Sequence, residues 1–207
     1  MLKILGRVTS INVRKVLWTA DELGLSYERE DWGLPLRDPH EPEFLALNPN
    51  ALVPVIIDDG FVLWESNPIM RYLCERQGKA GLIPEDLRTR ALMDQWLGWQ
   101  STELPGIWRY AFLAFGRPTP GYDDPKLIDA SIAGWTKKML VLEAQLQAHG
   151  PFVLGERMTL ADIALGVAVH RWFATRFEHP ELPAVSDYYE GLKGRPAAVP
   201  YLGTTTP

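Results

Sequence analysis

Apolar and polar positions follow two different periods along the chain. In residues 1–78, short apolar runs alternate with stretches whose apolar residues recur every three or four positions. The short runs predict strands and the longer period predicts amphipathic helices. The predicted strands are residues 2–5, 25–30, 52–57 and 61–64, and the predicted helices are residues 13–23, residues 42–47 and a third that opens at residues 66–68.

From residue 86 onward the spacing is helical and no comparable strand pattern follows. The predicted helices are residues 86–115, 123–149, 159–173 and 184–193. The order β-α-β-α-β-β-α followed by helices predicts an α/β thioredoxin-like N-terminal domain and an all-α C-terminal helical bundle. The domains expected are residues 1–78 and 86–207, joined by a linker at residues 79–85.

Particular residue types mark the ends of these helices. Asn12 is the expected N-cap of the first helix and Gly24 its C-terminal stop. Ser66 is the expected N-cap of the third helix. Thr159, followed three residues later by Asp162, matches a capping box ahead of an apolar helix. Asp162 is therefore expected to stabilise the fold and to have no catalytic role.

Composition narrows the class of protein. The net charge of −5 and the absence of long basic runs argue against a nucleic-acid partner. A single cysteine, Cys74, can form no internal disulfide. No apolar stretch is long enough to predict a transmembrane helix, and the apolar run in residues 1–6 is too short to predict a signal peptide. We therefore expect a cytoplasmic protein with no membrane partner.

Two polar groups at helix starts could bind anions. Ser10 and Asn12 lie where the first helix begins, and the free N–H groups there can stabilise a thiolate. Ser66, at the start of the third helix, could bind a carboxylate, while Glu65 could accept from an ammonium group. Ordinary helix capping is the alternative for Ser10 and Asn12, and a capped helix with a solvated acid is the alternative for Glu65 and Ser66.

The Val53-Pro54 pair suggests a third contact. Proline at the start of a strand is often cis, and that geometry would turn the backbone of Val53 toward a peptide ligand. An ordinary proline in an edge strand is the alternative.

Taken in order and spacing, these segments resemble the cytosolic glutathione transferase superfamily over nearly the whole chain. The segments that carry the resemblance are residues 10–16, 42–45, 48–50, 52–55, 65–66, 69–73 and 155–162. The resemblance implies an enzyme that uses glutathione as co-substrate, needs no metal, works as a homodimer and takes a hydrophobic electrophile between its domains. Detoxification is the role that this activity implies.

The resemblance also assigns residues. Ser10 is similar to the thiolate-stabilising serine of theta- and delta-like members, and Asn12 to the asparagine of a group of bacterial and fungal members. Val53, Pro54, Glu65 and Ser66 match glutathione-contacting positions. The lysine that binds the glycyl carboxylate in many relatives is absent, because Ala51-Leu52 stands there. His40, or Arg37, is the candidate for that contact.

Aromatic and polar residues within residues 86–115 suggest the electrophile pocket. Trp108, Arg109 and Tyr110 combine aromatic surface with polar groups, as small-molecule pockets do. Packing in the core or at a subunit interface is the alternative for these residues. His170 and Trp172 are weaker candidates for the same pocket.

Three functions remain open from the sequence. The first is transfer of glutathione to an electrophile. The second is a glutathione-dependent peroxidase or disulfide reductase, and the third is a non-catalytic regulatory protein that binds glutathione. The sequence does not identify the electrophile.

Overall fold

The computed structural model describes residues 1–78 and 81–204. The chain divides into two compact units, Met1–Ala80 and Gly81–Pro207. This division falls within the predicted linker of residues 79–85, of which residues 79 and 80 lie outside the described residues. None of the helices in the described part is long and apolar enough to cross a membrane.

A four-stranded mixed sheet forms the centre of the first unit and confirms the predicted α/β class. Its strands are β1 (Leu2–Leu5), β2 (Tyr27–Glu30), β3 (Val55–Asp58) and β4 (Phe61–Trp64), in the order β2-β1-β3-β4. Strand β1 is parallel to β2 and antiparallel to β3, which is antiparallel to β4. The register pairs Leu5 with Val55 and Val55 with Trp64. The loops after β1, before β3 and after β4 therefore leave the sheet at one edge.

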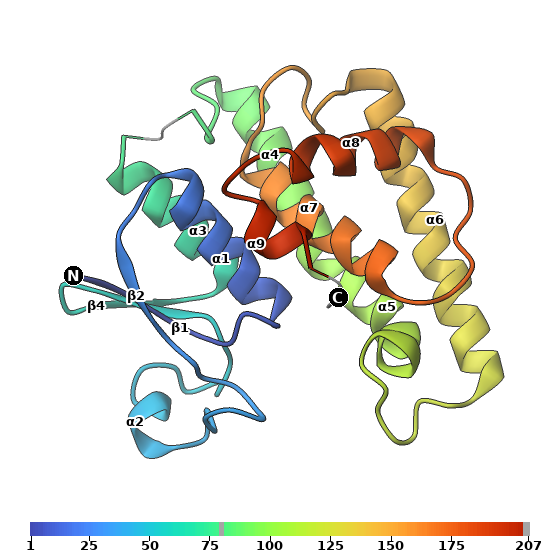
Figure 1. Ribbon diagram of the computed structural model, residues 1–207. Coiled ribbons are helices and arrows are strands. Elements are labelled where there is room, and N and C mark those ends of the chain that lie inside the picture. Colours follow the sequence, from blue (N-terminus) through green and yellow to red (C-terminus); the bar gives the residue numbers. More distant parts are fainter. Residues whose placement is uncertain (79–80, 205–207) are drawn as a thin grey trace. The chain divides into compact units, whose positions relative to one another are not determined.

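Helices cover both faces of this sheet (Figure 1). Helices α1 (Ile11–Glu22) and α3 (Ser66–Arg76) pack together on one face, and α2 (Pro42–Leu45) lies on the other. Successive strand residues face opposite sides, so Ile4 points toward α1 and α3 and Leu5 toward α2. Leu5 packs there against Trp32 and Phe44. The helices on both faces therefore pack against the sheet through apolar side chains.

The ends of α1 and α3 differ in part from the prediction. Ser10, with φ −85° and ψ 125°, is the N-cap of α1, and Glu65 is the N-cap of α3. Asn12 and Ser66 already have helical backbone, so their prediction as N-caps was wrong. The stop at Gly24 is confirmed: Gly24 has φ 64° and donates its backbone N–H to the Asp21 carbonyl.

The second unit is helical, as predicted. Its elements are α4 (Leu87–Thr102), α5 (Leu104–Ala111), a π-helical turn (Phe112–Gly116), α6 (Pro125–His149), α7 (Leu160–Ala174), α8 (Pro183–Lys193) and α9 (Val199–Leu202). The prediction of one helix over residues 86–115 was wrong, because a turn at Glu103 interrupts the helix between α4 and α5. Pro105 lacks an N–H and lies in the first turn of α5, where no intrahelical donor is needed.

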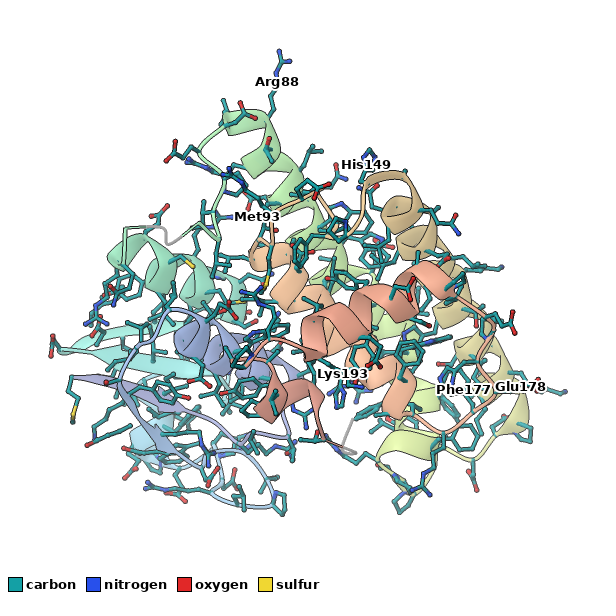
Figure 2. All side chains as sticks on the ribbon, turned by 45° about the horizontal axis from the view of Figure 1, so that its top comes forward. Arg88, Met93, His149, Phe177, Glu178 and Lys193 are labelled. Carbon is teal, nitrogen blue, oxygen red and sulfur yellow. The ribbon has the colours of Figure 1, made fainter. Side chains whose placement is uncertain are left out.

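Helix α7 forms the core of this unit. Every residue from Leu160 to Trp172 is buried, and the helix packs against α4, α8 and α9. The predicted capping box at its start is confirmed, since Asp162 accepts the backbone N–H of Thr159 at 2.7 Å. Near its end, the ring centroid of Trp172 lies 5.0 Å from that of Phe177, and Phe177 is labelled in Figure 2.

Candidate active site

The start of α1 presents two polar side chains at the sheet edge where β1 ends. Ser10 caps the helix through its backbone only, since its side chain makes no capping hydrogen bond. The hydroxyl is therefore not committed to the helix. Asn12 lies in the first turn and is exposed. Free backbone N–H groups and the helix dipole favour an anion at this end.

The start of α3 brings a carboxylate and a second hydroxyl to the same edge. Glu65 is exposed and has φ 73°, a left-handed backbone that a residue with a Cβ seldom adopts. Ser66 is 4% exposed, and its Oγ donates to Asn12 Oδ1 at 3.4 Å. The two helix starts are thereby joined side chain to side chain.

The loop before β3 supplies the third side of the site. The Val53–Pro54 peptide bond is cis, as predicted. Asn48 is buried and organises this loop, because its Nδ2 donates to the Leu52 carbonyl at 2.8 Å. Its Oδ1 accepts from the backbone and the side chain of Asn50, at 3.1 and 2.9 Å.

These three segments enclose one pocket within the first unit. The lining residues are Asn12, Asn48, Leu52, Val53, Pro54, Glu65 and Ser66. Five of them were predicted as site residues from the sequence. Asn48 and Leu52 were missed, although the Asn48-Pro49-Asn50 segment is a turn pattern in which an asparagine side chain often bonds to nearby backbone. The pocket brings together a carboxylate, a hydroxyl and the N-termini of two helices. The carboxylate can accept from an ammonium group, and the hydroxyl and helix N-termini can bind a carboxylate, so the pocket matches a peptide end that carries both charges.

Ser10 and His40 are not among these lining residues. Ser10 precedes the pocket-lining Asn12 by two residues, at the same helix start. The exposed His40 ring lies 2.9 Å from Asp38 Oδ1, and hydrogen bonds from His40 lower the pKa of the Asp38 carboxyl. The alternative candidate, Arg37, stacks its guanidinium 3.7 Å from the Trp32 ring centroid.

The residues predicted for the electrophile pocket have different surroundings in the second unit. Trp108 is buried against Trp135, with ring centroids 5.5 Å apart. Arg109 is exposed. The Tyr110 hydroxyl accepts the backbone N–H of Asp124 at 3.2 Å, which fixes it to the loop before α6. Three successive helical positions point in three directions, as helix geometry requires.

The two weaker candidates are both buried. His170 Nδ1 lies 2.8 Å from the Tyr189 hydroxyl, which itself donates to the Leu202 carbonyl at 3.0 Å. Trp172 packs edge-on against Trp135, with ring centroids 5.1 Å apart. Both side chains belong to the packing of the helical unit.

The single thiol lies away from the pocket lining. Cys74 is fully buried in α3, and burial raises its pKa to about 12. The thiol is therefore protonated at neutral pH and is a poor nucleophile. Within residues 1–78 and 81–204, no group of three His, Cys, Asp or Glu side chains is placed to hold a metal ion.

Comparison with known proteins agrees with the fold. The family description "Glutathione S-transferase, N-terminal domain" matches residues 9–76, and "Glutathione S-transferase, C-terminal domain" matches residues 122–191. Glutathione S-transferase GstB of Escherichia coli (strain K12) is 34% identical over 199 residues, which is 95% of each chain. Glutathione S-transferase D7 of Drosophila melanogaster is 32% identical, over 90% of this chain and 80% of its own.

Solved structures show the same likeness. The theta class glutathione S-transferase from the citrus canker pathogen Xanthomonas axonopodis pv. citri, with glutathione bound, has a TM-score of 0.92 and 35% identity. The match covers 98% of this chain and 97% of that one. An epsilon-class glutathione S-transferase from the housefly, Musca domestica, has a TM-score of 0.86 and 27% identity. The chain belongs to the glutathione S-transferase family.

Proposed function

We propose that the protein is a glutathione transferase that joins the glutathione thiolate to a hydrophobic electrophile. The observation that carries this function is the pocket at the sheet edge, where the starts of α1 and α3 meet beside the Val53–Pro54 bond. Family membership and the likeness to a structure with glutathione bound support the same ligand.

The γ-glutamyl and cysteinyl parts of glutathione have matching groups in this pocket, and the glycyl part is assigned to a residue outside its lining. The γ-glutamyl carboxylate binds the N-terminus of α3 at Ser66, and its ammonium group donates to Glu65. The cysteinyl backbone pairs with Val53 next to Pro54 in the manner of an added strand. His40 is assigned to the glycyl carboxylate. Loss of the Glu65 carboxylate in Glu65→Ala should weaken glutathione binding by about 1–3 kcal/mol.

Ser10 and Asn12 stabilise the thiolate in this scheme. Lowering the pKa of a thiol by two units takes about 2.7 kcal/mol of selective thiolate stabilisation. A hydrogen bond to a charged group supplies about 1.5–3 kcal/mol, so a hydroxyl or amide of this kind is sufficient. The thiolate lone pair then forms the new sulfur–carbon bond, and the leaving group departs with its bonding electrons.

Two further assignments complete the proposal. Of the three candidates for the electrophile pocket, Arg109 and Tyr110 supply surface, and the buried Trp108 supports them by packing against Trp135. A second copy of the chain is the expected partner, and Phe61 and Trp64 on the edge strand β4 offer exposed aromatic surface for such contacts. Sedimentation of the purified protein measures the oligomeric state, and a monomer at micromolar concentration contradicts the dimer.

The test compares two activities of the purified protein. Glutathione with 1-chloro-2,4-dinitrobenzene measures transfer, and glutathione with a hydroperoxide measures peroxidase activity. Transfer that depends on Ser10 and Asn12 is the expected result. Retention on immobilised glutathione without either activity would instead favour a non-catalytic binding protein.

A further inference from the structure

A lysine is buried on α1, three residues after Asn12, which lines the proposed glutathione pocket. Lys15 lies on α1 and is only 1% exposed, which is rare for a lysine because removing an ammonium group from water is costly. Its neighbours Val13 and Val16 are fully buried. An apolar side chain at this position would fill the same space without that cost.

Lys15 and Asn12 share a face of α1, and this face meets the first turn of α3. The two residues are three positions apart, so their side chains lie next to each other along the helix. Lys15 Nζ donates to Asn67 Oδ1 at 3.0 Å, and Asn12 Oδ1 accepts from Ser66 Oγ at 3.4 Å. Two successive residues of α3 are thereby tied to two residues of α1.

Glu65 is the charged group of the pocket that acts on Lys15. Burial lowers the pKa of Lys15 to about 7, and the Glu65 carboxylate opposes this shift. The ammonium form and the carboxylate therefore attract each other. Glu65 also has its backbone at φ 73°, a strained conformation that persists only where neighbouring groups hold it.

We propose that Lys15 is a positioning residue of the glutathione site, which holds Glu65 and the first turn of α3 where the γ-glutamyl ammonium group binds. It acts from inside the protein, through Asn67 and through its attraction to Glu65, and it does not touch glutathione. This inference rests on the proposed function, because it assumes that Glu65 accepts from that ammonium group.

The experiment compares glutathione with glutaryl-cysteinylglycine, an analogue that lacks only the γ-glutamyl amino group. Calorimetric titration of the whole protein gives the dissociation constant of each. The unaltered protein should bind glutathione about tenfold or more tightly than the analogue. In Lys15→Met that ratio should fall at least fivefold, through loss of glutathione affinity, while affinity for the analogue changes less than twofold.

Two variants serve as controls. Lys15→Arg keeps a positive charge at the site and should restore most of the ratio. Lys3→Met removes a partly exposed lysine of β1 that pairs with Glu28 and Glu30, and it should leave the ratio unchanged. The Michaelis constant for 1-chloro-2,4-dinitrobenzene at saturating glutathione should be equal in all of these proteins.

The outcomes distinguish failure of the role assigned to Glu65 from failure of the positioning role of Lys15. If the unaltered protein binds both ligands equally, the assigned role of Glu65 in the proposed function is wrong. If it discriminates and Lys15→Met discriminates equally well, the positioning role of Lys15 is wrong. An equal loss of affinity for both ligands in Lys15→Met means a purely structural role and also overturns the inference. If Lys15→Met does not fold, Asn67→Ala is measured, and an unchanged ratio there refutes the proposal.

Discussion

Glu143 of α6 accepts the backbone N–H of Val185, at the start of α8, at 2.9 Å. Its other carboxylate oxygen accepts the N–H of Ala184 at 3.1 Å. The residue preceding α8, Leu182, has no side-chain acceptor to cap that helix. A buried acid from a neighbouring helix therefore satisfies the free donors and the positive end of the helix dipole.

Glu143→Ala should lower the free energy of unfolding by about 1–3 kcal/mol, because the buried N–H of Val185 and the part-buried N–H of Ala184 lose a charged acceptor. Glu143→Gln keeps one acceptor oxygen and should lose less. Denaturant unfolding followed by tryptophan fluorescence measures both variants. Equal stability of all three proteins would show that water caps α8 as well as the carboxylate does.

Ser10→Ala and Asn12→Ala should each raise the pKa of the bound glutathione thiol by at least about half a unit, worth about 0.7 kcal/mol. The activity profile should move to higher pH by the same amount, since less thiolate is present at any given pH. Ultraviolet absorbance of the bound thiolate during titration gives the pKa directly. No shift in either variant means that another group stabilises the thiolate.

Asp162→Ala should reduce stability and the yield of folded protein, with nearly normal activity per folded molecule. The carboxylate accepts from the backbone N–H groups of Val153 and Thr159, at 2.9 and 2.7 Å, and from the Tyr188 hydroxyl at 3.3 Å. Loss of these bonds should cost about 3 kcal/mol or more. Thermal melting measures the effect, and normal melting with abolished turnover would instead make Asp162 a site residue.

Cys74 should resist thiol reagents in the folded protein. Burial raises its pKa to about 12, so at pH 8 the reactive thiolate is nearly absent, and in the unfolded chain the pKa returns toward the ordinary value of about 9. Modification by a chromogenic disulfide should be slow in buffer and complete within seconds in denaturant. Fast modification of the native protein would mean that α3 opens readily.

Arg109→Ala and Tyr110→Phe should change the Michaelis constant for the electrophile and leave that for glutathione nearly unaltered. Arg109 is exposed, so its removal should have little effect on stability. Steady-state kinetics with each substrate varied in turn separates the two constants. Equal changes for both substrates would assign these residues to packing or to a subunit contact.

The fold was predictable because its signals are local. Apolar runs such as residues 2–5 identify strands, and Thr159 with Asp162 marks a helix start on sequence spacing alone. The break before Leu104 does have a local sign, because Pro105-Gly106 inside a helical pattern indicates that one helix ends and another begins. It was missed because the apolar spacing continues across the break.

Much of the pocket was predictable from local signals. Glu65 and Ser66 lie at a helix start, so their availability could be inferred from position. Asn48 bonds only to nearby residues, and the turn pattern of residues 48–50 is its local sign. Lys15 bonds to Asn67, 52 positions away, and this contact follows only from the folded chain. A lysine on an amphipathic helix is ordinarily exposed, so nothing local distinguishes a buried one.

The left-handed backbone of Glu65 limits how this position can evolve. Glycine would adopt φ 73° and ψ 120° without strain, but it carries no carboxylate. A substitution that removes the backbone strain at this position would therefore stabilise the fold but lose the carboxylate that recognises the ligand. A lineage that abandons glutathione could gain stability by one change at this residue, and glycine at this position in a homologue would suggest a lost or altered activity.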